Sequence, residues 1–362
     1  MLPYYFLIIV PFFIEAVEMM LQSNQKLIFN KRTSNCSIIV FFVILFAMLS
    51  LRSISCGIDL VNYQYTFGWI AKLNNISDCI ENTTVEPLYV ILNWLVAQIY
   101  CDFRWFMVVV AFLCTGITGW FYWRESKCAP LTILLFVLNP CFFMFYSGLR
   151  QALAMLLVVP AYYMVLRKKL IPFILMVFIA YFFHSSALIM LFLYPIFHTP
   201  LRSKHFVFVL SLVGVFFLFK SQIFTNVLPF LADKYVEHYG YVTETNSYAM
   251  WALFLLFLLY AFIVPDDAKM TPKQNGLRNT LVVMTMIQGF ASIHTIAMRF
   301  NLYFIMLLPI IIPELLMVPK KGNEDIARIS KWIMICFFCF FFFYKAEPGG
   351  GLNAFPYKAF WE

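Results

Sequence analysis

Three arginines stand at the ends of long apolar segments, where an ionisable side chain is costly and is a candidate for function. They are Arg52, Arg150 and Arg299. A guanidinium group binds phosphate through paired N–H donors and keeps its charge when it is partly removed from water. Three such side chains on one face would therefore bind an anion such as a diphosphate. For Arg52 and Arg299 the alternative is a long side chain that reaches to the lipid headgroups.

Three other residues carry groups that can accept a proton, namely His184, Asp59 and Glu86. An imidazole or a carboxylate beside a hydroxyl group can act as a general base. His184 and Asp59 compete for that role, and Glu86 is the third candidate. The alternative interpretation of His184 is a turn histidine that only satisfies hydrogen bonds within the protein.

Aromatic and amide side chains near these residues are typical of a sugar-binding surface. Tyr63 lies four residues after Asp59, one turn away if the stretch is helical. Tyr89 follows Glu86, and Gln151 follows Arg150. Rings cover the apolar faces of sugars, while acids and amides bind hydroxyl groups. An aromatic belt at the membrane interface is the competing interpretation of the tyrosines.

The elements that must hold these groups are membrane helices. The chain has 362 residues, of which 63% are hydrophobic and 12% are charged. Soluble domains are about half apolar and about a quarter charged. The apolar residues form uncharged blocks close to the ~20 residues that cross a bilayer core. This composition excludes soluble enzymes, nucleic-acid binders and secreted disulfide scaffolds, and the net charge of +8 comes from basic residues in short loops.

We predict an all-α, polytopic integral membrane protein, with residues 1–362 forming a single membrane domain. About thirteen apolar segments are expected; they lie near 2–21, 37–51, 87–101, 105–123, 129–147, 151–166, 170–183, 185–197, 206–221, 248–264, 279–298, 300–318 and 332–344. Short loops rich in Lys and Arg stay inside. The loops 52–86 and 222–247, the tail 345–362 and the turns at Arg150, His184 and Arg299 are therefore expected outside.

The charge pattern of the first third requires one apolar segment that does not cross. The segment 87–101 is the preferred candidate, because it is short and opens with Pro87. A re-entrant helix is tolerated where protein buries it or where it lines a wet cavity. The alternative is a first segment that lies in the interface.

Five short motifs, in this order along the chain, resemble the EpsG-type family of Wzy-like polysaccharide polymerases. They are an apolar segment ending in Arg52, then Gly57-x-Asp59-x-x-x-Tyr63, Glu86-Pro87-x-Tyr89, Arg150-Gln151-x-x-Ala154 and Phe183-His184-x-Ser186-Ala187-Leu188. Arg299 before an apolar block and the closing Pro356-Tyr357 fit the same pattern. Each motif alone is weak, but the ordered set covers nearly the whole chain.

The resemblance implies a GT-C-like membrane glycosyltransferase that needs no metal and no cofactor. Such proteins join oligosaccharide units carried on undecaprenyl diphosphate into O-antigen, capsule or exopolysaccharide, at the periplasmic face of the bacterial inner membrane. A chain-length regulator is a candidate partner, and nucleic acid is not. In this scheme Arg150 and Arg299 bind diphosphate, with Arg52 as a weaker third, while Gln151, Tyr63 and Tyr89 contact substrate.

Two other functions remain open at this point. A flippase or transporter of lipid-linked sugars would need charged groups along a path through the membrane, whereas the candidate residues gather on one face. A ligase that places finished glycan on another acceptor uses nearly the same chemistry, so the sequence does not separate it from a polymerase.

Overall fold

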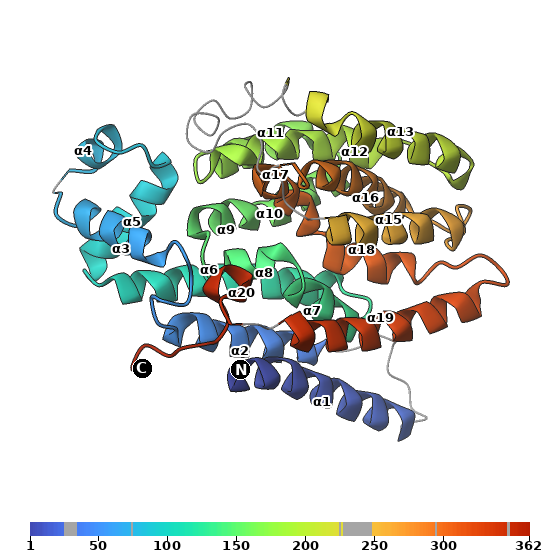
Figure 1. Cartoon of the computed structure of the whole chain (residues 1–362), viewed down its shortest axis with the longest axis horizontal. Helices are drawn as coiled ribbons and strands as arrows, with labels where there is room; N and C mark the ends of the chain where they lie inside the picture. The colour runs from blue at the N-terminus through green and yellow to red at the C-terminus, as the bar shows by residue number, and fades with distance from the viewer. Residues whose placement is uncertain (25–34, 74, 224–225, 227–247, 294, 346–347) are drawn as a thin grey trace. The chain divides into compact units, whose positions relative to one another are not determined.

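The computed structural model describes residues 1–24, 35–73, 75–223, 226, 248–293, 295–345 and 348–362. The elements of this part are α-helices and short 3-10 helices, which confirms the prediction of an all-α membrane protein (Figure 1). The chain divides into two compact units, which are described separately: residues 1–159, 179–185 and 333–362 form the first, and 160–178 and 186–332 the second. The predicted outer loop 222–247 lies almost entirely outside the described residues.

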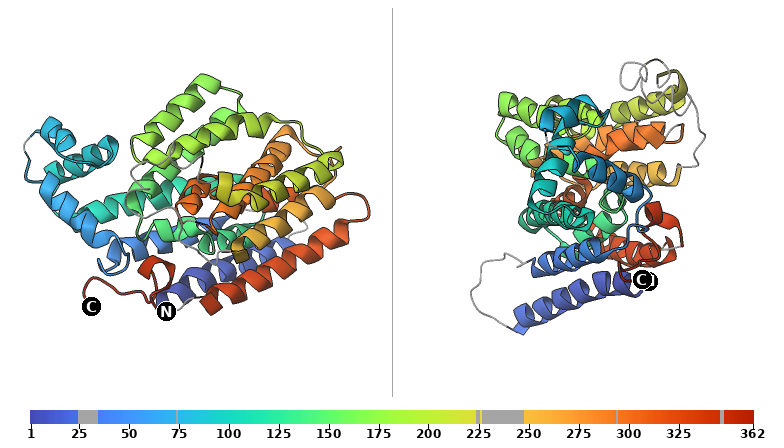
Figure 2. Two further views of the ribbon diagram at one scale, coloured as in Figure 1. Left: turned by 45° about the horizontal axis from the view of Figure 1, so that its top comes forward. Right: turned by 90° about the vertical axis from the view of Figure 1, so that its left-hand side faces the viewer.

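The first unit contains ten helices, or parts of the chain that form them, before and after the long central insertion. They are α1 (Leu2–Asn24), α2 (Cys36–Leu51), α3 (Leu60–Ile70), α4 (Ile76–Glu81), α5 (Pro87–Ile99), α6 (Phe103–Glu125), α7 (Ala129–Val137), α8 (Pro140–Met144), α9 (Leu149–Leu156) and α20 (Gly350–Asn353). α2 packs between α1 and α6 (Figure 2). Gly119 permits the close approach of α6 to α2, because a Cβ atom there would lie 2.9 Å from the Phe42 ring.

The second unit is arranged around α16 (Pro272–Phe290), which contacts each of its main neighbours. These are α12 (Leu193–His198), α13 (Phe206–Leu218), α15 (Tyr248–Ile263), α17 (Thr295–Ile305) and α18 (Leu308–Leu315). Buried polar groups on α16 have partners in the same unit. Arg278, 1% exposed, donates to Asp267 at 2.6 Å and to the Leu201 carbonyl at 2.6 Å, so this basic residue is part of the fold.

Three helices are long and apolar enough to cross a membrane, and there are up to five candidates if each of two bent helix pairs counts as one span. The three are Phe103–Glu125, Leu149–Leu166 and Glu324–Tyr344. They contain α6, then α9 with α10 (Val158–Leu166), and most of α19 (Glu324–Lys345). Several predicted spans break instead into short helices: 129–147 becomes α7 and α8, and 300–318 breaks between α17 and α18. In the first case Asn139-Pro140 starts a new helix, since Asn139 caps it through its side chain.

The region 52–86 is not a plain loop, because it folds into α3 and α4. Two aromatic residues one turn apart on α3 contact the start of α5 and the start of α6. The ring of Tyr63 lies 5.6 Å from that of Tyr89, at the start of α5, and the ring of Phe67 lies 5.9 Å from that of Phe103, beyond its end. α5 has 13 residues, or ~20 Å of helix against a ~30 Å hydrocarbon core. This geometry favours the prediction that 87–101 does not cross.

Candidate active site

Three of the predicted site residues meet at one carboxylate in the first unit. Glu86 Oε2 accepts a hydrogen bond from Arg150 Nη1 at 2.7 Å, and Glu86 Oε1 lies 3.0 Å from His184 Nδ1. The residues are separated by up to 98 positions in sequence. Exposure falls across the group, from 32% for the Arg150 side chain to 17% for Glu86 and 5% for His184. The guanidinium is therefore the group most open to a ligand, and the imidazole lies behind it.

Helix ends place each member of this group. Glu86 is the residue before α5, where Pro87 occupies the first turn and fixes the start of the helix. Arg150 is the second residue of α9, after the turn Tyr146-Ser147-Gly148. His184 follows α11 (Leu170–Tyr181), and its N–H donates to the Ala180 carbonyl at 2.9 Å. The chain between Arg150 and His184 thus leaves this group and returns to it, in agreement with the prediction that both turns lie on one face.

The charge of Glu86 decides the roles of its partners. Burial acts to raise the pKa of Glu86, but the hydrogen bond with His184 and the charge of Arg150 outweigh it and lower the pKa to about 2. At neutral pH the group is a carboxylate, which can only accept hydrogen bonds. His184 must therefore carry hydrogen on Nδ1. In the neutral imidazole this leaves the lone pair on Nε2, the form that a general base requires.

Asp59 is held close to this group by the turn that carries Arg150. Its Oδ2 accepts a hydrogen bond from Ser147 Oγ at 3.1 Å. The backbone N–H of Asp59 donates to Ser147 Oγ, also at 3.1 Å. Gly57 makes the approach possible: its φ is +151°, and a Cβ atom there would lie 2.2 Å from the Tyr146 carbonyl oxygen. In the motif Gly57-x-Asp59, the glycine thus allows close backbone contact with Tyr146, and the aspartate supplies the carboxylate.

Tyr63 links Asp59 to Arg150. Burial raises the pKa of Tyr63, whereas the charge of Arg150 and a hydrogen bond with its side chain act in the opposite direction. The side chain of Tyr63 is 9% exposed, and that of Tyr89, packed against it, is fully buried. Tyr63 thus interacts with Arg150, and Tyr89 packs against Tyr63. Direct contact of Tyr89 with substrate stays a prediction that its burial does not favour.

The other predicted residues lie elsewhere. Arg52 is 1% exposed; its Nη1 donates to the Phe145 carbonyl at 3.0 Å, and its guanidinium lies 5.4 Å from the centre of the Tyr146 ring. It lies behind the turn that carries Arg150 and does not reach lipid headgroups. Gln151 is 4% exposed. Arg299 is half-buried on α17 in the second unit. The predicted ligand roles of these three residues remain untested.

Two functional contacts were not predicted from the sequence. Ser147 is fully buried, and its hydroxyl group donates a hydrogen bond to Asp59. The signal in the sequence that could have identified this residue is its place in the turn before Arg150. In the second unit, Ser186 Oγ lies 2.9 Å from the Tyr303 hydroxyl. Tyr303 is one turn beyond Arg299 on α17, so this contact fixes the face of the helix that carries the arginine.

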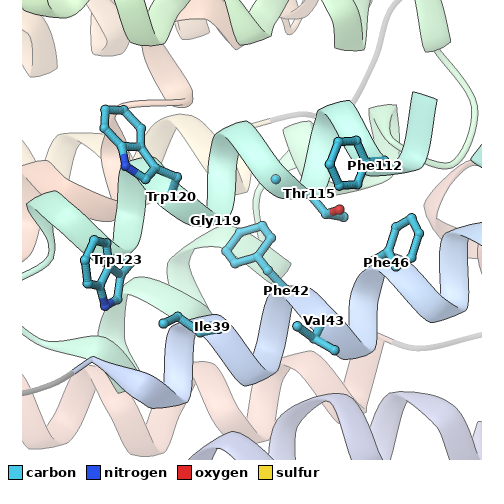
Figure 3. A pocket seen from close by; sticks show the side chains of 10 residues that line it. Ile39, Phe42, Val43, Phe46, Phe112, Thr115, Gly119, Trp120 and Trp123 are labelled. Carbon is cyan, nitrogen blue, oxygen red and sulfur yellow. The ribbon is translucent and has the colours of Figure 1, made fainter. Parts of the chain in front are cut away.

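A separate hollow in the first unit has a different character. It lies between α2 and α6, has a volume of about 400 Å³ and is lined mainly by apolar side chains, among them Phe42, Phe46, Phe112 and Trp120 (Figure 3). None of its lining residues is ionisable. Its surface suits a hydrocarbon chain and carries no group that could transfer a proton or bind a phosphate.

Comparison with known proteins gives one match. The model of the EpsG family matches residues 35–359, which is nearly the whole chain and includes every predicted site residue. No curated protein and no solved structure matches the chain.

Proposed function

Because the chain belongs to the EpsG family, which is of the Wzy-like polymerase type, we propose that this multi-pass membrane protein polymerises lipid-linked oligosaccharides. The donor is an oligosaccharide chain on undecaprenyl diphosphate, and the acceptor is the sugar of a second lipid-linked unit. The product is a surface polysaccharide such as O-antigen, capsule or exopolysaccharide. The active face is extracytoplasmic, at the periplasmic side of a bacterial inner membrane, as the distribution of basic loops predicts.

The observation that carries this proposal is the sharing of Glu86 by Arg150 and His184. In the reaction, the bond between the donor's anomeric carbon and the diphosphate oxygen breaks, and the diphosphate leaves with the electron pair. A bond forms between that carbon and the acceptor hydroxyl oxygen, whose proton passes to His184 Nε2. Charge grows on the departing diphosphate, where a fixed cation is most effective.

Arg150 fits the role of that cation. Its guanidinium has five N–H donors, and the bond to Glu86 uses one edge of the group. About a third of the side chain is exposed, so the remaining donors can reach a ligand. Glu86 then acts as a positioning residue, since a carboxyl group with a pKa of about 2 is too weak a base to take the proton of a hydroxyl group. Asp59 is the alternative base, and Arg299 is a proposed second ligand of the diphosphate.

Arginine supplies the positive charge in this scheme, so the proposed enzyme is independent of a metal ion. The bond between sugar and diphosphate provides the driving force, and no cofactor is needed. The lipid bilayer is the protein's environment, and a chain-length regulator is its proposed partner. Full transfer in the presence of EDTA is expected, and loss of transfer that Mg²⁺ restores would contradict metal independence.

The test is the glycan ladder of a strain that lacks the gene and carries variants of it. Arg150→Lys keeps a charge but loses the two-pronged geometry, so it should retain part of the polymer, and Arg150→Ala almost none. Protein levels in the membrane should stay near normal. His184→Ala and Asp59→Asn decide between the two bases, because loss of the base should cost ~10²- to 10⁴-fold.

The same gels separate the alternative functions. Single-unit glycans in the deletion strain identify a polymerase, the absence of exported glycan identifies a flippase, and full-length polymer that stays on its lipid carrier identifies a ligase. Full polymer from Arg150→Ala at normal expression would place the diphosphate site elsewhere.

A further inference from the structure

A cavity with both polar and apolar lining lies along α3, the helix that carries Tyr63, and we propose that it binds saccharide units of the lipid-linked oligosaccharide. This inference rests on the proposed function and adds a substrate subsite to it. The cavity has a volume of about 670 Å³, within the usual ~300–1,000 Å³ of small-molecule sites. It lies between α3 and the connection from α5 to α6.

Side chains on the two walls provide the groups that bind sugars. α3 contributes the amide of Gln64, the turn after it contributes the ammonium group of Lys72, and the connection contributes Tyr100 and the carboxylate of Asp102. Tyr100 is 61% exposed, so its ring is available to an apolar sugar face. Asp102 Oδ1 accepts the Arg104 N–H at 2.8 Å, which fixes the carboxylate at the start of α6. Donors, acceptors and a ring suit a neutral or amino sugar better than a hydrocarbon chain.

The cavity and the candidate active site share α3. Tyr63, which interacts with Arg150, is the residue before Gln64, the first cavity residue. From Gln64 to its end at Ile70, α3 rises by ~9 Å. Phe67 lines the cavity, and its ring lies 5.5 Å from that of Phe106, which in turn lies 5.8 Å from the ring of Tyr89. A sugar chain whose reacting end lies at Arg150 can therefore extend over this surface.

Gly68 leaves the centre of the cavity open. It lies within α3, and a Cβ atom added there would meet no atom within 4 Å. The space for a side chain is thus present, and a large residue at this position would occupy the cavity without displacing the core. Gly214 on α13 is equally open by the same measure and lies in the other unit, so it offers a matched control.

The experiment compares Gly68→Trp with Gly214→Trp in membrane vesicles. The probe is the undecaprenyl-diphosphate-linked repeat unit extracted from the deletion strain, which is both donor and acceptor. Gly68→Trp should raise KM about tenfold or more, because the indole would prevent the sugar from making roughly one or two hydrogen bonds in the cavity. The value of kcat should stay near that of the wild type. Gly214→Trp should match the wild type. Gln64→Ala and Tyr100→Ala should raise KM by less, and they keep the test open if the tryptophan variant does not reach the membrane.

Two results would overturn the saccharide site. One is a wild-type KM for Gly68→Trp at normal membrane levels, and the other is a fall in kcat with KM unchanged. Either result leaves the proposed function intact, provided that the wild-type protein elongates the lipid-linked unit in the same assay. If the wild-type protein does not elongate it, the proposed function fails and not merely the subsite.

Discussion

Replacement of Glu86 by glutamine is the sharpest test of the candidate active site. The carboxylate accepts from Arg150 Nη1 at 2.7 Å and contacts His184 Nδ1 at 3.0 Å. Glutamine has nearly the same shape but one acceptor and one donor group. It can satisfy one partner, while its NH₂ group faces the N–H of the other. If His184 responds by moving its hydrogen to Nε2, it can no longer accept a proton there.

The expected loss follows from the two bonds. Hydrogen bonds to charged groups contribute about 1.5–3 kcal/mol each, and a general base contributes ~10²- to 10⁴-fold in rate. We therefore expect Glu86→Gln to lower kcat at least ~10²-fold and to lower the free energy of unfolding by about 2 kcal/mol. The folded-state pKa of Glu86, about 2, lies below its usual 4.5, so its stabilising contribution is complete above pH 4.5 and is lost as the pH falls toward 2. Glu86 stays ionised between about pH 6 and 8, so the loss of stability should not vary across that window.

The assay measures elongation of the lipid-linked repeat unit in membranes, together with the thermal stability of the protein in detergent. Glu81→Gln is the matched control, because Glu81 is an exposed carboxylate at the end of α4 and should tolerate the change. The double variant with Arg150→Ala should show non-additive losses, since the two residues share a bond. A wild-type rate for Glu86→Gln at normal expression would refute the argument that this carboxylate orients His184.

Two further predictions test the scaffold around the site. In a background with no other cysteine, native Cys101 and a cysteine at Thr84 should both react with an impermeant thiol reagent from outside, because α3 contacts both the start of α5 and Phe103 beyond its end; labelling from opposite sides would show that α5 crosses. Gly57→Ala should lower the melting temperature and polymer yield, since the added Cβ atom would lie 2.2 Å from the Tyr146 carbonyl oxygen; unchanged values for both would contradict that close contact.

Local patterns in the sequence were sufficient for the class of fold and for part of the site. Apolar blocks identify a helical membrane protein because a bilayer admits few other structures. Arg150 and His184 were predicted to meet because each ends an apolar segment on the same side of one basic turn. Asp59 and Tyr63 were predicted to lie one helical turn apart, and the structure places Asp59 at the N-cap of α3, where its carbonyl accepts a hydrogen bond from the Tyr63 N–H at 3.0 Å. These inferences depend on spacing along one or two adjacent helices.

The roles of Glu86, Arg52 and Ser147 depended on the tertiary structure. Glu86 ranked as a third base by residue type, but its two partners come from distant segments and lower its pKa to about 2, which makes it a carboxylate that orients them. Arg52 looked like a ligand for an anion, yet its side chain is buried against the Phe145 carbonyl. A sequence fixes which residues are apolar and how far apart they stand along a helix, because these are local properties. Burial and charge at one atom depend on every segment that packs around it, so only the folded chain decides whether a carboxylate is a base or a support.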